Sequence, residues 1–366
     1  MSVLEFRLKQ AAQPLTDAWR HVPVAPRGRT LLGVSFRVPQ VAALGLDARA
    51  TLRDLLAYPF QLLRLGAYWN RIEPEPGTFQ TDELDRQVAA AEQAGKQIIL
   101  CVGPIKTFGY PEFFVPAHYL PRPLPEHTRI KPSAYSALLS AATTFIIRLV
   151  ERYKQHQSIV AWQLEHEAVD PLGVEHSWRL DAAFVEQEIA ALRKADGSRP
   201  VIMNGFLPTS LPVRLSQWWR TRDQGDSLAV AQRLADMVGI DYYPRHALAP
   251  VGSKTLYLDG SQSRRARQRA QQMLAWGHAH GRPLLIAEGQ AEPWESVTIP
   301  PSLDKQGLYS CLPEQVITNY NTCMGWIGQE APLYAYLFWG AEYWMLRKQG
   351  ADSSYLQAFA RVLEQA

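Results

Sequence analysis

The stretch "SAYSALLSAATTFIIRLVERYKQHQSIVAWQLE" (133–165) joins a long amphipathic segment to a short apolar run. Its first part, 133–155, predicts a helix, because it is long and its apolar residues recur with helical spacing. Its last part, 158–165, predicts a strand buried on both faces, because the apolar residues are continuous rather than alternating. A helix followed by a buried strand is the repeating unit of a parallel sheet.

The same unit recurs along the whole chain. The predicted strands are 31–37, 60–68, 97–103, 158–165, 200–204, 237–243, 283–289 and 333–339. The predicted helices are 48–57, 81–95, 133–155, 180–197, 226–236, 264–280, 314–329 and 354–365. Eight β-α units predict a single closed (β/α)8 TIM barrel over 30–366, with residues 1–29 as an N-terminal extension packed on it. Asp181 should cap one helix, and Gly197 and Gly281 should end two others.

Composition narrows the class of protein. The chain has 366 residues, of which 47% are hydrophobic and 20% charged, as in soluble globular proteins. Its formal charge is +3 with both signs mixed, so we expect no nucleic-acid partner. No apolar run is long enough for a membrane span, so we expect no membrane partner and a cytoplasmic location, with a secreted form after signal removal as the alternative. The three cysteines should be free buried thiols, and we expect no metal and no cofactor.

Acidic residues stand where two of the strands end. Glu165, His166 and Glu167 end the fourth strand, and Glu288 ends the seventh. Active sites of this barrel form at the carboxyl ends of the strands, and strands four and seven lie on opposite sides. Facing carboxylates among aromatic residues suit the cleavage of glycosidic bonds, which needs one protonated and one ionised carboxyl group. The aromatic residues expected at this end include Trp69, Tyr243, Trp294 and Trp339.

Three segments resemble one clan of enzymes. "LLRLGAYWNRIEPEPGTF" (62–79), "AWQLEHE" (161–167) and "LLIAEG" (284–289) resemble motifs on the second, fourth and seventh strands of the (β/α)8 retaining glycoside hydrolases. That clan includes cellulases, β-mannanases and β-galactosidases. "GIDYYP" (239–244) is similar to the clan's sixth-strand motif. The order of the motifs is more specific than any one of them.

The resemblance implies a role for each matching residue. Glu167 would be the general acid/base, and Glu288 the nucleophile. Arg64 and Tyr243 would hydrogen-bond the nucleophile, and Trp339 would form the floor of the sugar subsite. The remaining expected substrate-binding residues are Trp69, His166, Asn204 and Trp294.

One position departs from the clan's pattern. His166 stands where the clan usually has an asparagine that binds the 2-hydroxyl of the sugar, and some mannan-cleaving barrels resemble this chain in having histidine there. We therefore expect altered recognition at the sugar's 2-position. Glu165 shares a face with Glu167 and should be a structural acid paired with a buried base. Glu292 is a competing nucleophile, although it lies in a loop rather than at a strand end.

The best-supported function is a retaining glycoside hydrolase that cleaves β-linked hexosides, with an oligosaccharide or glycoside as its partner. A non-catalytic carbohydrate-binding barrel is the first alternative, and a transglycosidase with the same residues is the second. A metal-dependent hydrolase with His166 as a ligand is weaker, because the first strand lacks an H-x-H motif. The sugar, the choice between exo and endo action and the oligomeric state do not follow from the sequence.

Overall fold

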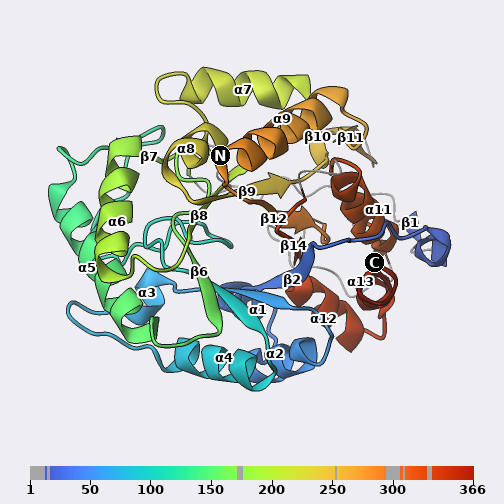
Figure 1. The fold of residues 1–366 in the computed structure, drawn as a ribbon, viewed down its shortest axis with the longest axis horizontal. Helices are drawn as coiled ribbons and strands as arrows, with labels where there is room; N and C mark the ends of the chain where they lie inside the picture. Colours follow the sequence, from blue (N-terminus) through green and yellow to red (C-terminus); the bar gives the residue numbers. More distant parts are fainter. Residues whose placement is uncertain are drawn as a thin grey trace. The chain divides into compact units, whose positions relative to one another are not determined.

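The barrel predicted from the sequence is confirmed. A computed structural model describes residues 13–14, 17–170, 176–251, 254–293, 306–307, 310–327 and 332–366. It contains a closed eight-stranded barrel surrounded by helices (Figure 1). In order around the barrel, the strands are β12 (Leu284–Gln290), β14 (Ala335–Trp339), β2 (Leu31–Phe36), β3 (Leu62–Gly66), β4 (Gln97–Cys101), β6 (Ile159–Gln163), β8 (Val201–Phe206) and β9 (Met237–Tyr242).

Each predicted helix is present, and the described residues contain four further α-helices that were not predicted. The predicted ones are α2 (Ala48–Leu56), α4 (Asp82–Gln93), α5 (Ser136–Tyr153), α6 (Ala182–Ala195), α8 (Ser227–Leu234), α9 (Arg264–His280), α11 (Pro313–Met324) and α13 (Ser354–Gln365). The additional ones are α1 (Val38–Ala43), α3 (Trp69–Ile72), α7 (Leu211–Thr221) and α12 (Ala341–Gln349), besides the 3-10 helix η2 (Asp17–His21).

The chain divides into two compact units. The first unit is Met1–Phe60, Leu207–Arg214 and Asp241–Ala366, and the second unit is Gln61–Phe206 and Leu215–Ile240. In the first unit, β14 pairs in parallel with both β12 and β2. In the second, β3, β4, β6 and β8 pair in parallel in that order, and α5 packs beside α6 (Figure 1). The separation of an extension at 1–29 from a barrel at 30–366 stays a prediction.

Short strands lie outside the barrel. β10 (Arg245–Val251) and β11 (Lys254–Asp259) form an antiparallel pair after β9 that was not predicted. β5 (Arg129–Ile130) pairs in parallel with β7 (Arg179–Leu180), and β1 (Gln13–Pro14) pairs antiparallel with β13 (Gln306–Gly307). The β5–β7 pair ties the segment before α5 to the start of α6.

Helix ends follow the local sequence in two of three predicted cases. Asp181 caps α6 by accepting a hydrogen bond from the amide of Ala183. Gly281 ends α9 in the left-handed conformation, at φ 62°. Helix α6 ends at Ala195, before the predicted Gly197, because Asp196 turns out of the helix and accepts from the indole of Trp162.

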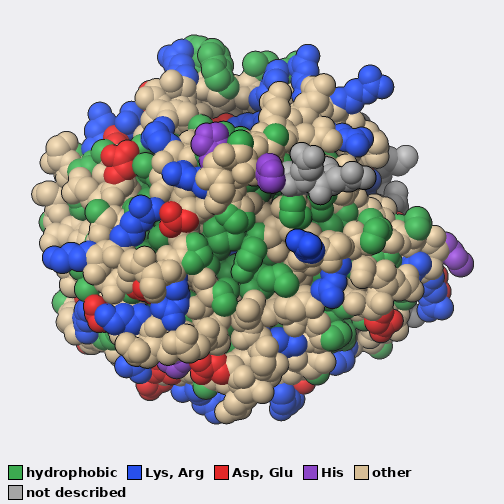
Figure 2. Space-filling view, viewed as in Figure 1, with side chains coloured by type: hydrophobic (Ala, Val, Ile, Leu, Met, Phe, Trp, Pro, Cys, Tyr) green, Lys and Arg blue, Asp and Glu red, His purple; other side chains and the backbone are tan. Residues whose placement is uncertain are grey.

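The face drawn in Figure 2 carries charges of both signs, with basic side chains spread among apolar and acidic ones. The basic run "RRARQRA" (264–270) starts α9, and its arginines point outward between the buried Ala266 and Ala270. All three cysteines are free and buried, as predicted. None of the helices among the described residues combines the length and apolarity that a bilayer span requires.

Candidate active site

Glu288 lies near the end of β12 in the first unit. The whole strand is buried, and the Glu288 side chain is 1% exposed. Its Oε2 atom accepts a hydrogen bond of 2.6 Å from the hydroxyl of Tyr243, which directly follows β9. The structure thus contains the contact between these two residues that the resemblance implies.

Tyr243 is the donor in its hydrogen bond with Glu288. Burial raises the pKa of Tyr243 well above its usual value, and the negative charge of Glu288 raises it further. The phenol therefore keeps its proton at neutral pH and acts as the donor. A donor this close favours the ionised form of the carboxyl group that accepts from it. An ionised carboxylate at a strand end is suited to nucleophilic attack.

A glycine next to Glu288 leaves room for the ring of Tyr336 from β14. A Cβ atom added at Gly289 would lie 2.2 Å from the ring and hydroxyl of Tyr336. The pairing of β12 and β14 shifts in register between Ile286 and Gly289. A larger residue at position 289 would displace this buried ring beside Glu288, so we interpret this glycine as a requirement of the site's geometry.

A buried cluster of opposite charges also lies in the first unit. The guanidinium of Arg37 lies 2.8 Å from Oε1 of Glu292, and its Nε donates to Oε2 of Glu342 over 2.9 Å. All three side chains are at most 1% exposed. Glu292, the competing nucleophile, is therefore a counterion of Arg37. Sequence reasoning missed Arg37 and Glu342, although Arg37 directly follows β2 and Glu342 lies three residues beyond β14.

Trp339 is the last residue of β14 and is 7% exposed. The guanidinium of Arg37 lies 4.1 Å from the centre of its ring. A cation this close to an aromatic face is attracted to it and limits the movement of the ring. The role of Trp339 as the floor of a sugar subsite stays a prediction.

Glu167 lies in a turn just after β6 in the second unit. Its φ angle is +42°, in the left-handed region that glutamate rarely adopts. The turn is closed by a hydrogen bond from the amide of Asp170 to the carbonyl of Glu167. The ammonium of Lys106, which follows β4, donates to the carbonyl oxygens of Glu167 and Asp170 over 2.9 and 3.2 Å. The strained backbone is thus held by a side chain from a neighbouring strand.

The carboxylate of Glu165 is held by main-chain donors and lies near the buried ammonium of Lys106, and the expected pairing with a buried base stays a prediction. Its carboxylate accepts hydrogen bonds from the amides of Ile105 and Lys106. Glu188 from α6 lies beside it, and both side chains are fully buried. Burial raises the pKa of Glu188 well above its usual value, and the charge of Glu165 raises it further, which favours the protonated form of Glu188.

Gly103 brings β4 close to this pair of acids. A Cβ atom at Gly103 would lie 2.3 Å from the amide nitrogen of Glu165. No other residue fits there without moving the main chain on one side. The close approach lets the loop after β4 place its amides on the carboxylate of Glu165.

Arg64, Gln163 and Asn204 form a buried polar row across three strands. Nε of Arg64 donates to Oε1 of Gln163 over 2.7 Å, and Nε2 of Gln163 donates to Oδ1 of Asn204 over 3.0 Å. The guanidinium of Arg64 also lies 3.9 Å from the centre of the Phe108 ring. The predicted contact of Arg64 with the nucleophile, and that of Asn204 with substrate, stay predictions.

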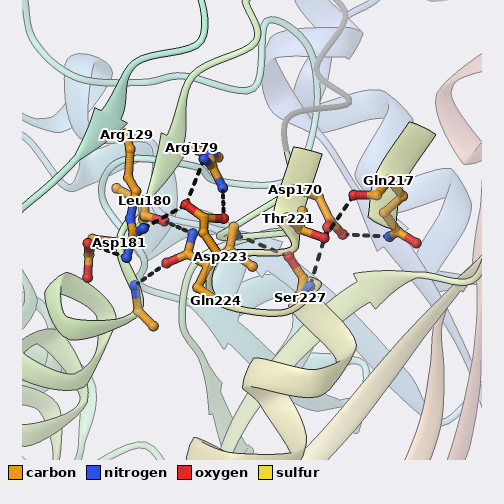
Figure 3. A network of polar contacts seen from close by, with 12 residues as sticks. Arg129, Asp170, Arg179, Leu180, Asp181, Gln217, Thr221, Asp223, Gln224 and Ser227 are labelled. Atoms are coloured by element: carbon orange, nitrogen blue, oxygen red, sulfur yellow. Dashed lines mark hydrogen bonds and ion pairs between the residues drawn. The ribbon is translucent and has the colours of Figure 1, made fainter. Parts of the chain in front are cut away.

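Asp170 links the Glu167 turn to helices α7 and α8. Its carboxylate accepts from Nε2 of Gln217 over 3.2 Å and from the amide of Ser227 over 3.3 Å (Figure 3). Burial, followed by the charges of Glu167 and Asp226, raises the pKa of Asp170 to about 7. Asp170 is therefore a second titrating acid close to the candidate acid/base, and sequence reasoning did not select it.

The remaining predicted substrate residues differ in placement. Trp69, in α3, is fully buried; its indole donates to Glu73 over 2.8 Å and stacks on Tyr119. His166 is 7% exposed, and its amide donates to the carbonyl of Lys106. Trp294 lies outside the described residues. Contacts of these three residues with substrate stay predictions.

Two comparisons with known proteins identify similar chains. A model of glycoside hydrolase family 42, described as beta-galactosidase, matches residues 52–186. This segment contains Arg64, Lys106 and Glu167. Comparison with curated protein sequences gives no match.

Solved structures of three kinds of enzyme resemble the whole chain. Xylanase 10B from Thermotoga petrophila RKU-1, in complex with xylobiose, is 14% identical, covers 92% of this chain and 94% of its own, and has a TM-score of 0.55. GH5_18 from Streptomyces cattleya, in complex with GlcNAc, is 14% identical over 92% of this chain and 81% of its own, with a TM-score of 0.56. The polyextremophilic beta-galactosidase from the Antarctic haloarchaeon Halorubrum lacusprofundi is 14% identical over 92% of this chain and 58% of its own, with a TM-score of 0.55.

At this level of identity the likeness to the three structures is one of fold, and this chain spans a little more than half of the length of the haloarchaeal enzyme. The family match and the fold point to the same group of proteins. The resemblance to the (β/α)8 glycoside hydrolases that the sequence motifs predict is therefore confirmed.

Proposed function

We propose that the protein is a retaining glycoside hydrolase that cleaves β-linked hexosides, with Glu288 as nucleophile and Glu167 as general acid/base. The observation that carries the proposal is the hydrogen bond from Tyr243 to a buried Glu288 at a strand end. It supports a carboxylate that stays ionised at neutral pH, which the first half of a retaining reaction needs.

In the first step, a carboxylate oxygen of Glu288 attacks the anomeric carbon. The bond from that carbon to the leaving oxygen breaks, and Glu167 gives its proton to this oxygen. The products are a glycosyl ester of Glu288, a free alcohol and an ionised Glu167.

In the second step, Glu167 takes a proton from water as the water oxygen attacks the anomeric carbon. The ester bond breaks, and Glu288 leaves as a carboxylate. Two inversions at one carbon retain the β configuration. The mechanism requires the two carboxyl groups to stand about 5 to 5.5 Å apart, which a crystal structure can test.

A β-galactoside is the first substrate to test, because the matching family model is described as beta-galactosidase. A β-mannoside is the second. His166 occupies the position expected to contact the 2-hydroxyl, which is axial in mannose, and imidazole offers a donor geometry that an amide does not. A panel of aryl β-galactosides, mannosides, glucosides and xylosides, with β-linked polymers, separates these cases.

The test has two parts. Wild-type protein should release the phenol from at least one aryl β-glycoside, and proton NMR should show the β anomer as the first product. Glu288→Ala should remove this turnover while leaving the thermal midpoint of unfolding nearly unchanged. Unchanged turnover in Glu288→Ala would exclude its role as the nucleophile.

Three alternatives give other results. A non-catalytic carbohydrate-binding barrel would bind oligosaccharides but release no phenol from any aryl glycoside. A transglycosidase would give more transfer product than hydrolysis product when an acceptor sugar is added. A metal-dependent hydrolase with His166 as a ligand would lose activity with chelators.

A further inference from the structure

The residue proposed as acid/base has a strained main chain. Glu167 is one of a few residues other than glycine with positive φ in the described part of the chain. For such a residue this conformation costs on the order of 1 to 3 kcal/mol and persists only when surrounding contacts enforce it.

Several polar main-chain groups in and beside the turn have partners. The amide of His166 donates to the carbonyl of Lys106, and the carbonyl of Ala168 accepts from the amide of Leu180. The amide of Val169 donates to the hydroxyl of Ser227 over 3.1 Å. These partners come from the β4 loop, from β7 and from α8, so the turn is fixed from three directions.

Lys106 makes the contact that spans the turn. Its ammonium joins the carbonyls of Glu167 and Asp170, the first and last residues of the turn. Lys106 is 1% exposed. A buried ammonium group loses much of its hydration and is kept only where other groups replace the lost water. Here those groups are the two carbonyl oxygens of the turn and the nearby carboxylates of Glu165 and Asp170.

Asp170 anchors the other end of the turn. Its carboxylate is held by Gln217 from α7 and by the first residue of α8, Ser227 (Figure 3). The hydroxyl of Ser227 holds the amide next to Asp170. Lys106 on one side and Ser227 on the other thus hold the turn between them.

We propose that Lys106 is a positioning residue for the acid/base, because its ammonium bridges the carbonyls of Glu167 and Asp170 and enforces the left-handed conformation at Glu167. The inference rests on the proposed function. Without the bridge, the turn relaxes and the carboxyl group of Glu167 moves away from the leaving oxygen. Proton transfer is sensitive to such shifts, since a displacement of about 1 Å can lower a rate by about 10²-fold.

The dependence of rate on the leaving group separates positioning from general damage. A phenol of low pKa leaves without a proton, whereas a phenol of high pKa needs one from Glu167. The measured quantity is the ratio of kcat/KM on a 2,4-dinitrophenyl β-glycoside to kcat/KM on the matching phenyl β-glycoside. Loss of the acid should raise this ratio, and Glu167→Ala sets its upper limit.

Lys106→Met should raise the ratio by about tenfold or more, within that limit, and Lys106→Arg should restore part of the loss. Lys96→Met is the matched control. Lys96 is 9% exposed and lies at the opposite end of β4, so its loss also removes a buried ammonium, but far from the turn. The control should leave the ratio unchanged, even if both Met variants have lower thermal midpoints.

Ser227→Ala provides a milder test if Lys106→Met does not fold. It removes only the hydroxyl partner of Val169 and should raise the ratio about threefold, a smaller loss than that of a full 1 Å displacement. Equal loss of both activities in Lys106→Met, or an unchanged ratio in both Lys106→Met and Ser227→Ala, would overturn the inference. If wild-type protein is inactive on all aryl glycosides, or if Glu167→Ala does not raise the ratio, the proposed function fails instead.

Discussion

The two candidate catalytic carboxylates are held by different parts of their residues. Glu288 ends a regular strand, and the phenol of Tyr243 donates to its side chain. Glu167 lies in a left-handed turn, and Lys106 holds its main chain. A donor to a carboxylate favours one protonation state, whereas an anchor on the main chain chiefly fixes position. The difference suits a nucleophile that stays ionised and an acid/base that gains and loses a proton.

The buried ionisable groups around the two residues also differ. In the first unit, Arg37 forms buried ion pairs with Glu292 and Glu342. In the second unit, the buried acids Glu188 and Asp170 have raised pKa values, so each can be neutral. One region is built from fixed charges and the other from groups that carry protons. Four experiments test this comparison.

The largest effect should come from removing each carboxylate and adding azide. Glu288→Ala should approach the roughly 10⁶-fold loss seen when a covalent nucleophile is deleted. Glu167→Ala should lose about 10² to 10⁴-fold on a phenyl glycoside. Azide should restore both on activated substrates, giving the α-glycosyl azide with Glu288→Ala and the β-glycosyl azide with Glu167→Ala. NMR of the products checks the roles, and the same anomer from both variants would remove the distinction.

The next largest effect concerns the fixed charges. Arg37→Met should lower the free energy of unfolding by about 3 to 5 kcal/mol, because it leaves Glu292 and Glu342 buried without their cation. Urea unfolding measures this loss. Arg193→Met is the control, since Arg193 pairs with Asp236 at the surface, where such a pair contributes at most about 1 kcal/mol. Equal losses would mean that the cluster is not a buried ionic unit.

The third effect is a pH dependence of stability at Asp170. Its folded pKa, about 7, lies above its unfolded value, so the folded state binds the extra proton. Stability is therefore full below about pH 4 and declines as pH rises to about 7. Asp170→Asn should be as stable as wild type at pH 4.5 and more stable at pH 8, by up to about 4 kcal/mol. Parallel pH profiles of the thermal midpoint in both proteins would contradict this.

The smallest of the four effects should come from Tyr243→Phe. A hydrogen bond to a charged group contributes about 1.5 to 3 kcal/mol, so kcat/KM should fall about 10 to 100-fold. Loss of the donor raises the pKa of Glu288, so the acidic limb of the pH–rate profile should move to higher pH. Tyr242→Phe is the matched control, because Tyr242 is the preceding residue and packs against Trp326. If the acidic limb moved in both variants, the shift would come from a change in packing and not from loss of the hydrogen bond.

The barrel was predictable because its strands are continuous apolar runs and its longer helices are amphipathic. The helices that were missed differ from these in length, in burial or in the exposure of their apolar face. α1 and α3 are too short for a periodic pattern, and α12 is buried along most of its length. α7 has a helical spacing of apolar residues, but they face outward: Leu211, Leu215, Trp218 and Trp219 are all exposed. Periodicity shows that a helix has an apolar face but not that this face is covered.

The candidate site was predictable where function depends on side chains at strand ends. Glu167, Glu288 and Tyr243 were selected by that position and by resemblance. Lys106 and Asp170 act on main-chain carbonyls and helix ends, and no residue type or spacing marks such contacts in a sequence. Arg37 stands at a strand end too, but its partners come from the loop after β12 and from helix α12, which only the fold brings together.

The left-handed turn at Glu167 also affects which substitutions are favoured at this position during evolution. Glycine and asparagine adopt this conformation with less strain than glutamate. Substitution of Glu167 by either residue should therefore stabilise the fold, and with Glu167 in its proposed role it would end catalysis. On this proposal, glutamate persists there only under selection for activity. Among relatives with this turn, the identity of residue 167 should separate working enzymes from barrels retained for another purpose.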